Sequence, residues 1–514
     1  MQFMSMELSS SSSSCFLFLL FIVPFLYFLK VAATTSLAAS TKRPRLAPGP
    51  TPLPIVGNLF ELGDKPHRSL ARLAKAHGPV MSLKLGRITT TVVSSPDAAK
   101  EALQKKGRAL SGRWVPDADR VLGHDRVAVV WLPPSQQWNN LRAVMRTYSF
   151  AARVLDASQG LRRQKVRELI SHVRGRTGRA VDVGGAVFDT ALNLISATAF
   201  SSDLVSLDHH SDHSRRGFKE VISGIMEEVG KPNLVDFFPL LSPIDPHGRR
   251  RKVTKYFKQL FGMIDDMIDD RLKLMKQQKN DTSSVSSDGC DLLDELLRSQ
   301  LDRPILRSLL ADYFIAGSDT SSVTVGWAMA ELLRSPSLMA MARAELASVV
   351  GPTREVVESD IPNLSFLRAV VKETFRLHPT SPLLLPHRAE ADVELGPYAV
   401  PKHSQVVVNV WAIGRDESVW EDAEAFKPER FLGSEVDFRG QHFELIPFGA
   451  GRRMCPGMPL ADRMVHLTLA SLIHSFEWRL SGGMKPGDVD LTEKFGVTLA
   501  LAVPLLAIPL PVKE

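Results

Sequence analysis

Hydrophobic and polar positions divide the chain into an apolar start, a long helical middle and a C-terminal part with short β-like runs. Residues 79–95 hold two β-rich runs around a Gly-Arg turn, which predicts a β-hairpin. Helical spacing dominates from about residue 96 to 350 and includes one long apolar helix from about 303 to 334. Short β-like segments return at 399–400 and 406–408. The pattern therefore predicts a single, mainly α-helical body with small β-sheets.

The N-terminal apolar run has no charged residue over positions 8–29. A helix of this length spans about 33 Å, which is enough to cross a bilayer once. Positive charges follow the run from Lys30 onward and none precedes it, so the positive-inside rule places the rest of the chain in the cytosol. Small residues at 32–33 and 37–39 leave a cleaved signal peptide as the alternative. We predict a retained, single-pass signal anchor over residues 1–30.

A proline-rich segment follows the predicted anchor. Four prolines between Ala47 and Pro54 favour a stiff, extended backbone. We therefore assign residues 31–54 to a linker and hinge, and residues 55–514 to one globular body. Glycosylation sequons at Asn280 and Asn363 should stay unmodified, because this topology keeps the body out of the lumen.

Composition narrows the possible partners. The chain carries 63 basic and 56 acidic residues, a net charge of +7 that is mild and dispersed, so we expect no nucleic-acid partner. This balance is compatible with an acidic protein or an anionic membrane surface. The 3 cysteines lie too far apart for a disulfide framework, which indicates a reducing compartment for the body.

The loop from Phe448 to Gly457 combines three glycines, two arginines and one cysteine in the pattern F-x-x-G-x-R-x-C-x-G. Glycine permits a positive φ or the close approach of a flat ligand. A Cys455 thiolate can ligate iron, and Arg453 can offset a carboxylate on a cofactor. An idle thiol is the alternative; a dinucleotide loop is not supported, because Met454 stands where the third glycine would be. The combination indicates haem held by a thiolate.

Two further stretches carry candidate chemistry. Trp138 and Arg142 are one helical turn apart, so an indole N–H and a guanidinium share a face that suits a carboxylate. The same spacing also occurs in core and surface pairs. Within the long helix, Gly317, Asp319 and Thr320 predict a bend with a hydroxyl and a carboxyl group, giving room for a diatomic ligand and a route for protons. A helix N-cap is the alternative.

Glu373 and Arg376 have the spacing E-x-x-R, which by itself is weak evidence. Glu295 with Arg298 and Glu331 with Arg334 have the same spacing, and such pairs are most often surface ion pairs. The pair at 373–376 differs because a P-E-R-F run containing Arg430 follows it, and then the cysteine loop.

A competing metal site is suggested by His209, His210, Asp212 and His213. No second ligand cluster accompanies them in the sequence, and they lie in a polar stretch. We interpret them as a solvated loop.

The order of these motifs resembles the cytochrome P450 superfamily in its plant microsomal type. The stretches 53–59, 316–322 and 458–461 are similar to the geraniol-hydroxylase-like family, which includes monoterpenol hydroxylases and grass hydroxylases of labdane-related diterpenoids. Tyr313 departs from the leucine that is more usual before Phe314, so we expect an altered groove wall there.

The resemblance implies the roles of the site residues. Haem b would be ligated through its iron by Cys455, while Thr320 and Asp319 would supply protons. The cofactor contacts it implies are Trp138, Arg142, Arg388, Phe448, Arg453 and Gly457, and His387 is a weaker candidate. Glu373, Arg376 and Arg430 would form a buried structural core. The implied substrate pocket is mostly aliphatic and is formed by Val127, Val129, Phe314, Ala316, Leu383, Leu384, Leu385, Val497, Thr498 and Leu499.

The resemblance also implies the reaction and its setting. We expect a monooxygenase domain on the cytosolic face of the endoplasmic reticulum membrane, using O2 and electrons from NADPH–cytochrome P450 reductase. The expected substrate is an apolar terpenoid of specialised or defence metabolism, or another apolar plant metabolite or xenobiotic. A haem protein without turnover and a reductase-independent haem isomerase or dehydratase are the alternatives.

Overall fold

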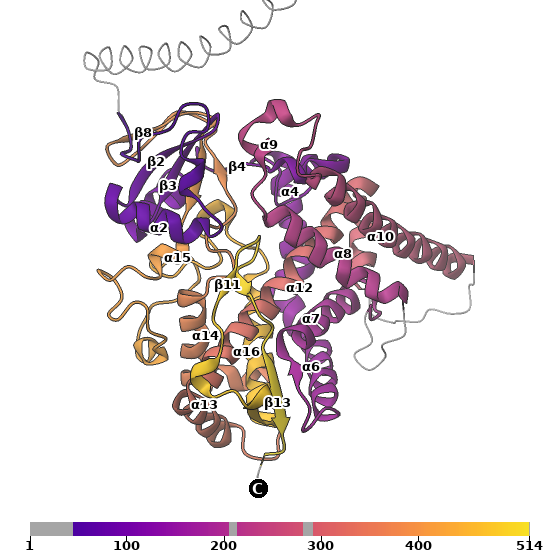
Figure 1. Ribbon diagram of the computed structural model, residues 1–514. Coiled ribbons are helices and arrows are strands. Elements are labelled where there is room, and N and C mark those ends of the chain that lie inside the picture. Colours follow the sequence, from indigo (N-terminus) through magenta and orange to yellow (C-terminus); the bar gives the residue numbers. More distant parts are fainter. Residues whose placement is uncertain (1–44, 205–212, 281–290, 513–514) are drawn as a thin grey trace, which may run out of the picture.

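The computed structural model describes residues 45–204, 213–280 and 291–512 (Figure 1). The predicted anchor at 1–30, residues 31–44 of the linker, most of the histidine stretch at 209–213 and the end of the Asn280 sequon lie outside the described residues.

Helices are the main secondary structure of the described chain, as the hydrophobic pattern predicted. Their bounds are α2 Pro66–His77, α3 Pro96–Lys100, α4 Gln136–Met145, α5 Ala152–Ala157, α6 Gln159–Arg174, α7 Val183–Phe200, α8 His213–Gly230, α9 Leu234–Phe237, α10 Arg249–Asn280, α11 Leu292–Arg298, α12 Arg303–Arg334, α13 Pro336–Val349, α14 Ser365–Leu377, α15 Val410–Ile413 and α16 Met458–Ser475. Two π-helical turns, Glu101–Lys105 and Arg146–Phe150, continue α3 and α4.

The strands are short and form four small sheets. The largest has the order β2-β3-β9-β6-β4, and the others are β1-β8-β7, β10-β13-β5 and β11-β12. Their bounds are β1 Arg45–Leu46, β2 Val80–Leu85, β3 Ile88–Val93, β4 Gly112–Arg113, β5 Val181–Asp182, β6 His387–Arg388, β7 Val393–Leu395, β8 Tyr398–Val400, β9 Gln405–Val408, β10 Glu477–Leu480, β11 Glu493–Lys494, β12 Ala500–Leu501 and β13 Leu506–Leu510.

The predicted hairpin at 79–95 is confirmed, because β2 and β3 pair antiparallel around Gly86, which has a φ of 55°. The predicted segments at 399–400 and 406–408 lie in β8 and β9. Two strands inside the predicted helical region, β4 and β5, were not predicted. Each has two residues and pairs with a strand more than 250 residues later in the chain, so no local pattern marks it.

The long predicted helix is confirmed as α12, which begins and ends at the predicted residues. It lies in the middle of the molecule and contacts α7, α10 and α16 (Figure 1). Among the described residues, α7 is the one helix long and apolar enough to span a membrane. Because 72% of that helix is buried inside the protein against its neighbours, we interpret it as a core helix.

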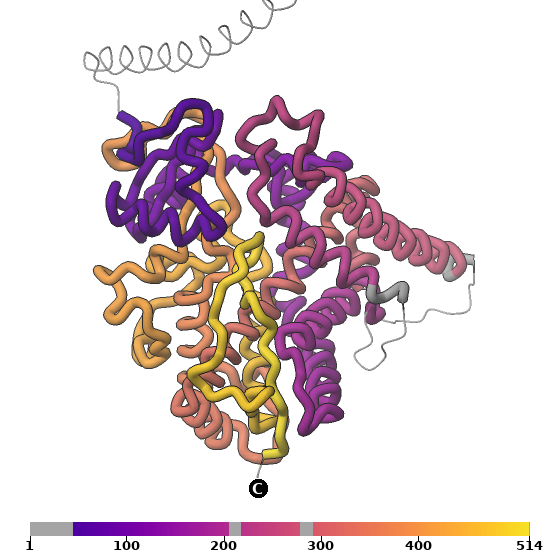
Figure 2. The backbone as a smooth tube through the Cα atoms, in the orientation of Figure 1, coloured from indigo at the N-terminus to yellow at the C-terminus, as the bar shows by residue number. Residues whose placement is uncertain are grey.

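The last part of the chain returns to the centre of the molecule. Figure 2 shows the C-terminal segment, in yellow, running between α6 and α7 on one side and the part formed by α13 to α15 on the other. The hairpin β11–β12 and the turn between its strands lie beside α12, since Trp327 Nε1 donates to the Leu499 carbonyl oxygen at 2.8 Å. This path brings residues near the C-terminus to the candidate groove on α12.

Candidate active site

The cysteine loop has a backbone that only glycine adopts easily at two positions. Gly449 has a φ of 67° and Gly451 a φ of 65°. A Cβ atom at Gly451 would also lie 2.2 Å from the Leu103 carbonyl oxygen. The Cys455 N–H donates to the Phe448 carbonyl oxygen at 3.0 Å, and this bond closes the loop just before α16 begins. The glycines and this hydrogen bond within the loop therefore fix the position of the Cys455 sulfur.

The Cys455 side chain has accessible surface, yet the protein atoms around it are close enough to desolvate the thiol. Desolvation raises the pKa of the thiol, whereas backbone N–H groups of Gly457 and Met458 and the charge of Arg142 act in the opposite direction. A side chain at Gly457 would lie 3.8 Å from the sulfur. Donors that favour the thiolate are therefore in place, and the glycine leaves space beside the sulfur atom.

Two arginines meet Trp138 next to this loop. The guanidinium carbons of Arg142 and Arg453 lie 5.6 Å and 4.5 Å from the Trp138 ring centroid. Arg142 also donates to the Met454 carbonyl oxygen at 2.9 Å, and Arg453 Nε to the Ser111 carbonyl oxygen at 2.8 Å. The Ser135 hydroxyl caps α4 by accepting from the Trp138 N–H, which sets the start of the helix and thus the common face of Trp138 and Arg142.

A third arginine, Arg113, belongs to this group and was not predicted. Burial, followed by the charges of Arg453 and Arg142, lowers the pKa of Arg113 to about 9. Burial and Arg142 likewise lower the pKa of Arg453 to about 10. Arg113 stands on the two-residue strand β4 with no motif around it, so the sequence offered no signal. We call Arg113, Arg142, Arg388 and Arg453 the arginine cluster.

Arg388 joins the cluster through the β4–β6 pairing, in which Gly112 lies opposite Arg388 and Arg113 opposite His387. Arg388 forms an ion pair with Glu390 at 3.3 Å. His387 is buried, and its Nδ1 donates to the Leu110 carbonyl oxygen at 2.7 Å. Burial lowers the pKa of His387 to about 3, so the ring is neutral. Of His387 and Arg388, only Arg388 therefore carries a positive charge that would attract an anionic ligand.

The residues present fit a haem. Trp138 Nε1, Arg113 Nε and Arg388 Nε are buried and find no hydrogen-bond partner among the described residues. A buried donor without a partner costs about 1–3 kcal/mol. Cations that lower one another's pKa likewise favour a bound anion. The two propionate groups of a haem would satisfy both requirements, beside a cysteine whose surroundings support iron ligation.

Replacing Trp138 by phenylalanine tests this fit. The change keeps an aromatic ring but removes the unpartnered N–H group, so haem dissociation should become at least about tenfold faster. Transfer of haem to an excess of apomyoglobin, followed by absorbance, measures the rate. Trp420→Phe is the matched control, since Trp420 Nε1 is also buried without a partner among the described residues, in contact with Phe431. Equal dissociation rates in the two variants would contradict the assignment of Trp138.

The two polar side chains of the candidate groove on α12, Thr320 and Asp319, form hydrogen bonds with different parts of the protein. The Thr320 hydroxyl donates to the Ala316 carbonyl oxygen at 2.8 Å, within the helix. The Asp319 carboxyl group points elsewhere, and its Oδ2 accepts from the Thr498 hydroxyl at 2.6 Å. A Cβ atom at Gly317 would lie 2.6 Å from Ile195 Cδ1, so this glycine also permits the close contact of α7 with α12.

Tyr313, which we expect to alter the groove wall, contacts the π-helical turn that continues α4. Its ring is buried, and its hydroxyl lies 2.5 Å from the Ser149 hydroxyl. Burial raises the pKa of this phenol. Phe150 lies 5.7 Å from the Tyr313 ring and 3.8 Å from the position of a Cβ atom on Gly457. Tyr313 thus contributes to the contact between α12 and the cysteine loop.

Glu373, Arg376 and Arg430 meet in the core beside the cysteine loop. Arg376 donates to Glu373 through Nε and one terminal nitrogen, both at 2.7 Å, and Arg430 Nε donates to Glu373 at 3.1 Å. The Lys427 N–H adds a fourth donor at 2.7 Å. Phe375 of the same helix contacts Phe448 at 5.2 Å between ring centroids. The charges are mutually satisfied, as burial requires.

Two of the predicted pocket residues have no exposed surface in the structure. Phe314 is 0% exposed and lies between Phe200 and Phe218, with ring centroids at 5.8 Å and 4.8 Å. Leu499 is also 0% exposed, and its N–H donates to the Thr380 carbonyl oxygen. Neither side chain has a surface that a ligand could touch.

The other predicted pocket residues differ in exposure. Ala316 is exposed although it lies in the middle of the central helix, and Val129 is buried with its N–H donating to Asp312 at 3.0 Å. Leu384 has a φ of 51° and lies 3.7 Å from the position of a Cβ atom on Gly449, beside the cysteine loop. The remaining candidates, Val127, Leu383, Leu385, Val497 and Thr498, are partly buried.

No group of three or more histidine, cysteine or acidic side chains with metal-binding geometry occurs in the part of the chain that the structure describes.

Comparison with known proteins agrees with this site. The family model described as cytochrome P450 matches residues 47–502. Geraniol 8-hydroxylase of Swertia mussotii is 50% identical over 92% of this chain and 95% of its own length. Geraniol 8-hydroxylase of Catharanthus roseus is 50% identical over 91% and 95%. Ferruginol synthase of Salvia miltiorrhiza is 42% identical over 93% and 97%.

Proposed function

This chain belongs to the cytochrome P450 family of haem-thiolate monooxygenases, and we propose that it hydroxylates an apolar terpenoid, either a monoterpenol or a labdane-related diterpenoid. The observation that carries this proposal is the 50% identity to two geraniol 8-hydroxylases over more than nine tenths of the chain. A relative named for making ferruginol supports a wider range of terpenoids.

The site residues have distinct tasks under this proposal. When bound, the haem supplies an iron centre that activates O2 for insertion of one oxygen atom into a C–H bond. Cys455 would ligate the iron, and the arginine cluster with Trp138 would hold the propionates. Thr320 and Asp319 would hold and move protons in the groove, while Glu373, Arg376 and Arg430 would keep the loop in place.

The side chains predicted for the pocket support the proposed substrate class. Val127, Ala316, Leu383, Leu385 and Val497 are aliphatic and have accessible surface. Aliphatic walls bind a hydrocarbon-like molecule and leave its orientation to few polar contacts.

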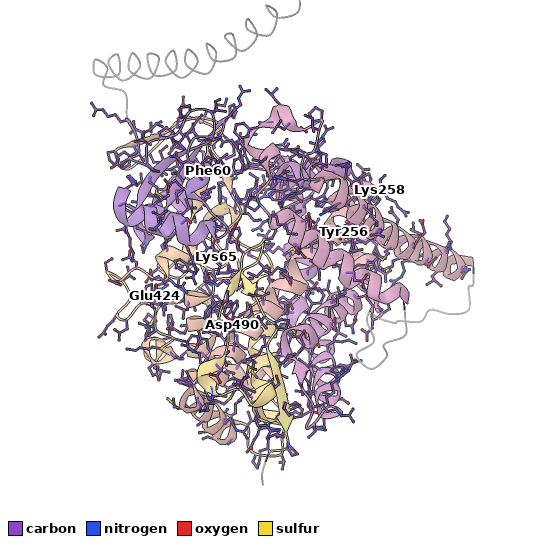
Figure 3. All side chains as sticks on the ribbon, viewed as in Figure 1. Phe60, Lys65, Tyr256, Lys258, Glu424 and Asp490 are labelled. Atoms are coloured by element: carbon purple, nitrogen blue, oxygen red, sulfur yellow. The ribbon has the colours of Figure 1, made fainter. Side chains whose placement is uncertain are left out.

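The proposed setting is the cytosolic face of the endoplasmic reticulum membrane, with electrons from an NADPH–cytochrome P450 reductase. Large apolar side chains that are more than two thirds exposed support a membrane contact: Ile55, Phe60, Leu240 and Ile244. The two segments that carry them lie in one region, because Leu59, Leu62 and Phe237 pack against the same hydrophobic cluster, and Phe60 is labelled in the same upper part of the molecule as α9 (Figures 1 and 3).

A substrate panel tests the proposal. The purified full chain is assayed with mono- and diterpenoids, with and without NADPH and reductase, and products are identified by mass spectrometry. We expect hydroxylated products that require both NADPH and reductase. Product without reductase would indicate an isomerase or dehydratase, and hydroxylation of other apolar compounds but no terpenoid would contradict the proposed substrate class.

A further inference from the structure

The Asp319 carboxyl group is held by a residue from the far end of the chain. Its Oδ2 accepts a hydrogen bond from the Thr498 hydroxyl at 2.6 Å, although 179 positions separate the two residues. Burial raises the pKa of Asp319, while this hydrogen bond and the charge of Lys494 act in the opposite direction. A short bond in partly desolvated surroundings is strong enough to decide where a carboxyl group points.

The turn that carries Thr498 has a fixed place on α12. The Leu499 N–H donates to the Thr380 carbonyl oxygen at 2.8 Å, and the Leu499 carbonyl oxygen accepts from Trp327 Nε1. At the other side of the turn, Val497 N lies 2.2 Å from the position of a Cβ atom on Gly230, the last residue of α8. Backbone contacts on both sides of Thr498 therefore define the position of its hydroxyl.

The base of the same hairpin is anchored through Glu493. This carboxylate is 3% exposed and accepts hydrogen bonds from His67 Nε2 at 3.0 Å, Arg68 Nε at 2.5 Å and Trp411 Nε1 at 2.9 Å. Burial alone would raise the pKa of Glu493, but the three donors hold it well below its usual range. The hydrogen bonds of Glu493 link β11 to α2 and α15, so polar contacts fix the position of the whole hairpin.

We propose that Thr498 is a positioning residue for Asp319, because its hydroxyl holds the carboxyl group in one orientation. The position of the C-terminal hairpin β11–β12 thereby sets the direction of this carboxyl group in the groove on α12. This inference rests on the proposed monooxygenase function, because it assigns a partner to a group that would move protons there. Val497 and Thr498 also have accessible surface on this turn. A substrate that presses on the turn would thus also act on the carboxyl group.

Titration of Asp319 tests the proposal without turnover. In the haem-loaded full chain, the infrared carbonyl band of the protonated carboxyl is followed against pH and assigned by its loss in Asp319→Asn. Thr498→Val removes a donor to the ionised form, so the titration midpoint should rise by about one to two pH units. Thr498→Ser keeps a hydroxyl and should restore the original midpoint.

Thr324→Val is the matched control for the infrared experiment. Thr324 is on the same helix, and its hydroxyl donates to the Thr320 carbonyl oxygen and lies 3.1 Å from the Thr380 hydroxyl. Its loss should leave the Asp319 midpoint unchanged. If Thr498→Val fails to bind haem, Thr498→Ala serves in its place with the same expectation. Equal midpoints in the parent and in these variants, or no band that Asp319→Asn removes, would overturn the proposal.

Turnover gives a second readout. Thr498→Val should raise the fraction of NADPH electrons recovered as hydrogen peroxide, because the proton supply is altered, and Thr498→Ser should restore the original fraction. A raised KM with unchanged peroxide would contradict a positioning role. If the parent enzyme hydroxylates no compound, the proposed function fails, whereas the infrared titration still decides the role of Thr498.

Discussion

Replacing Cys455 by serine should abolish the red-shifted Soret band of the reduced carbon monoxide complex and remove monooxygenase turnover. Turnover should fall by more than the roughly 10–100-fold that is typical when a residue hydrogen-bonded to a metal ligand is removed, because here the ligand itself is lost. Serine is nearly the same size and can accept the same N–H groups of Gly457 and Met458, so the loop should keep its fold. Absorbance spectra of the reduced protein with and without carbon monoxide measure the effect.

The neighbouring Met454 provides a control for this prediction. It also carries sulfur, but its side chain lies 3.1 Å from the position of a Cβ atom on Gly440. Met454→Leu should retain the band and most of the turnover. A red-shifted band that survives in Cys455→Ser would show that another residue ligates the iron.

Replacing Glu373 by glutamine should destabilise the protein by about 3–5 kcal/mol. Glu373 is 0% exposed and accepts from Arg376, Arg430 and the Lys427 N–H, so its loss leaves the Arg376 guanidinium buried without a counter-charge. Further bonds from Arg376 to the carbonyl oxygens of Gly414 and Ala423 do not replace that charge. Urea unfolding, followed by circular dichroism and by haem absorbance, measures the change.

Glu295→Gln is a matched control, since Glu295 and Arg298 have the same spacing in sequence. Their ion pair is 3.1 Å long and lies at the surface, with the two side chains 35% and 53% exposed. An exposed pair contributes at most about 1 kcal/mol. If the two glutamine variants lost equal stability, burial would not be the reason for the importance of Glu373.

The three E-x-x-R pairs also illustrate the limit of a local motif. Glu331 and Arg334 are 3.9 Å apart, but Glu331 is buried and accepts instead from His378 Nε2 at 2.7 Å, while the His378 ring stacks on Trp327 at 4.0 Å. One spacing thus occurs as a surface pair, a buried triad and a buried histidine contact. The flanking motifs, and not the spacing, distinguished Glu373 with Arg376.

The groove and the pocket depend least on local sequence. Phe314 and Leu499 were placed at the pocket by position, but they lie in the core. Thr498 was predicted as a pocket residue, whereas its bond to Asp319 could not be foreseen. Side-chain direction at these positions depends on the helices and turns packed around them, which no single stretch of sequence contains.

Several features depend only on neighbouring residues in the chain and could be predicted from them. These are the glycine loop around Cys455, the helix from Arg303 to Arg334 and the β2–β3 hairpin, because φ preferences and hydrophobic periodicity act over a few residues. Which distant groups meet depends instead on how the whole chain folds. The β4–β6 pairing brought Arg113 to the arginine cluster, and the returning C-terminal hairpin brought Thr498 to Asp319. Such contacts depend on burial and charge balance across the whole fold, and the spacing of residues within a short stretch of sequence does not predict them.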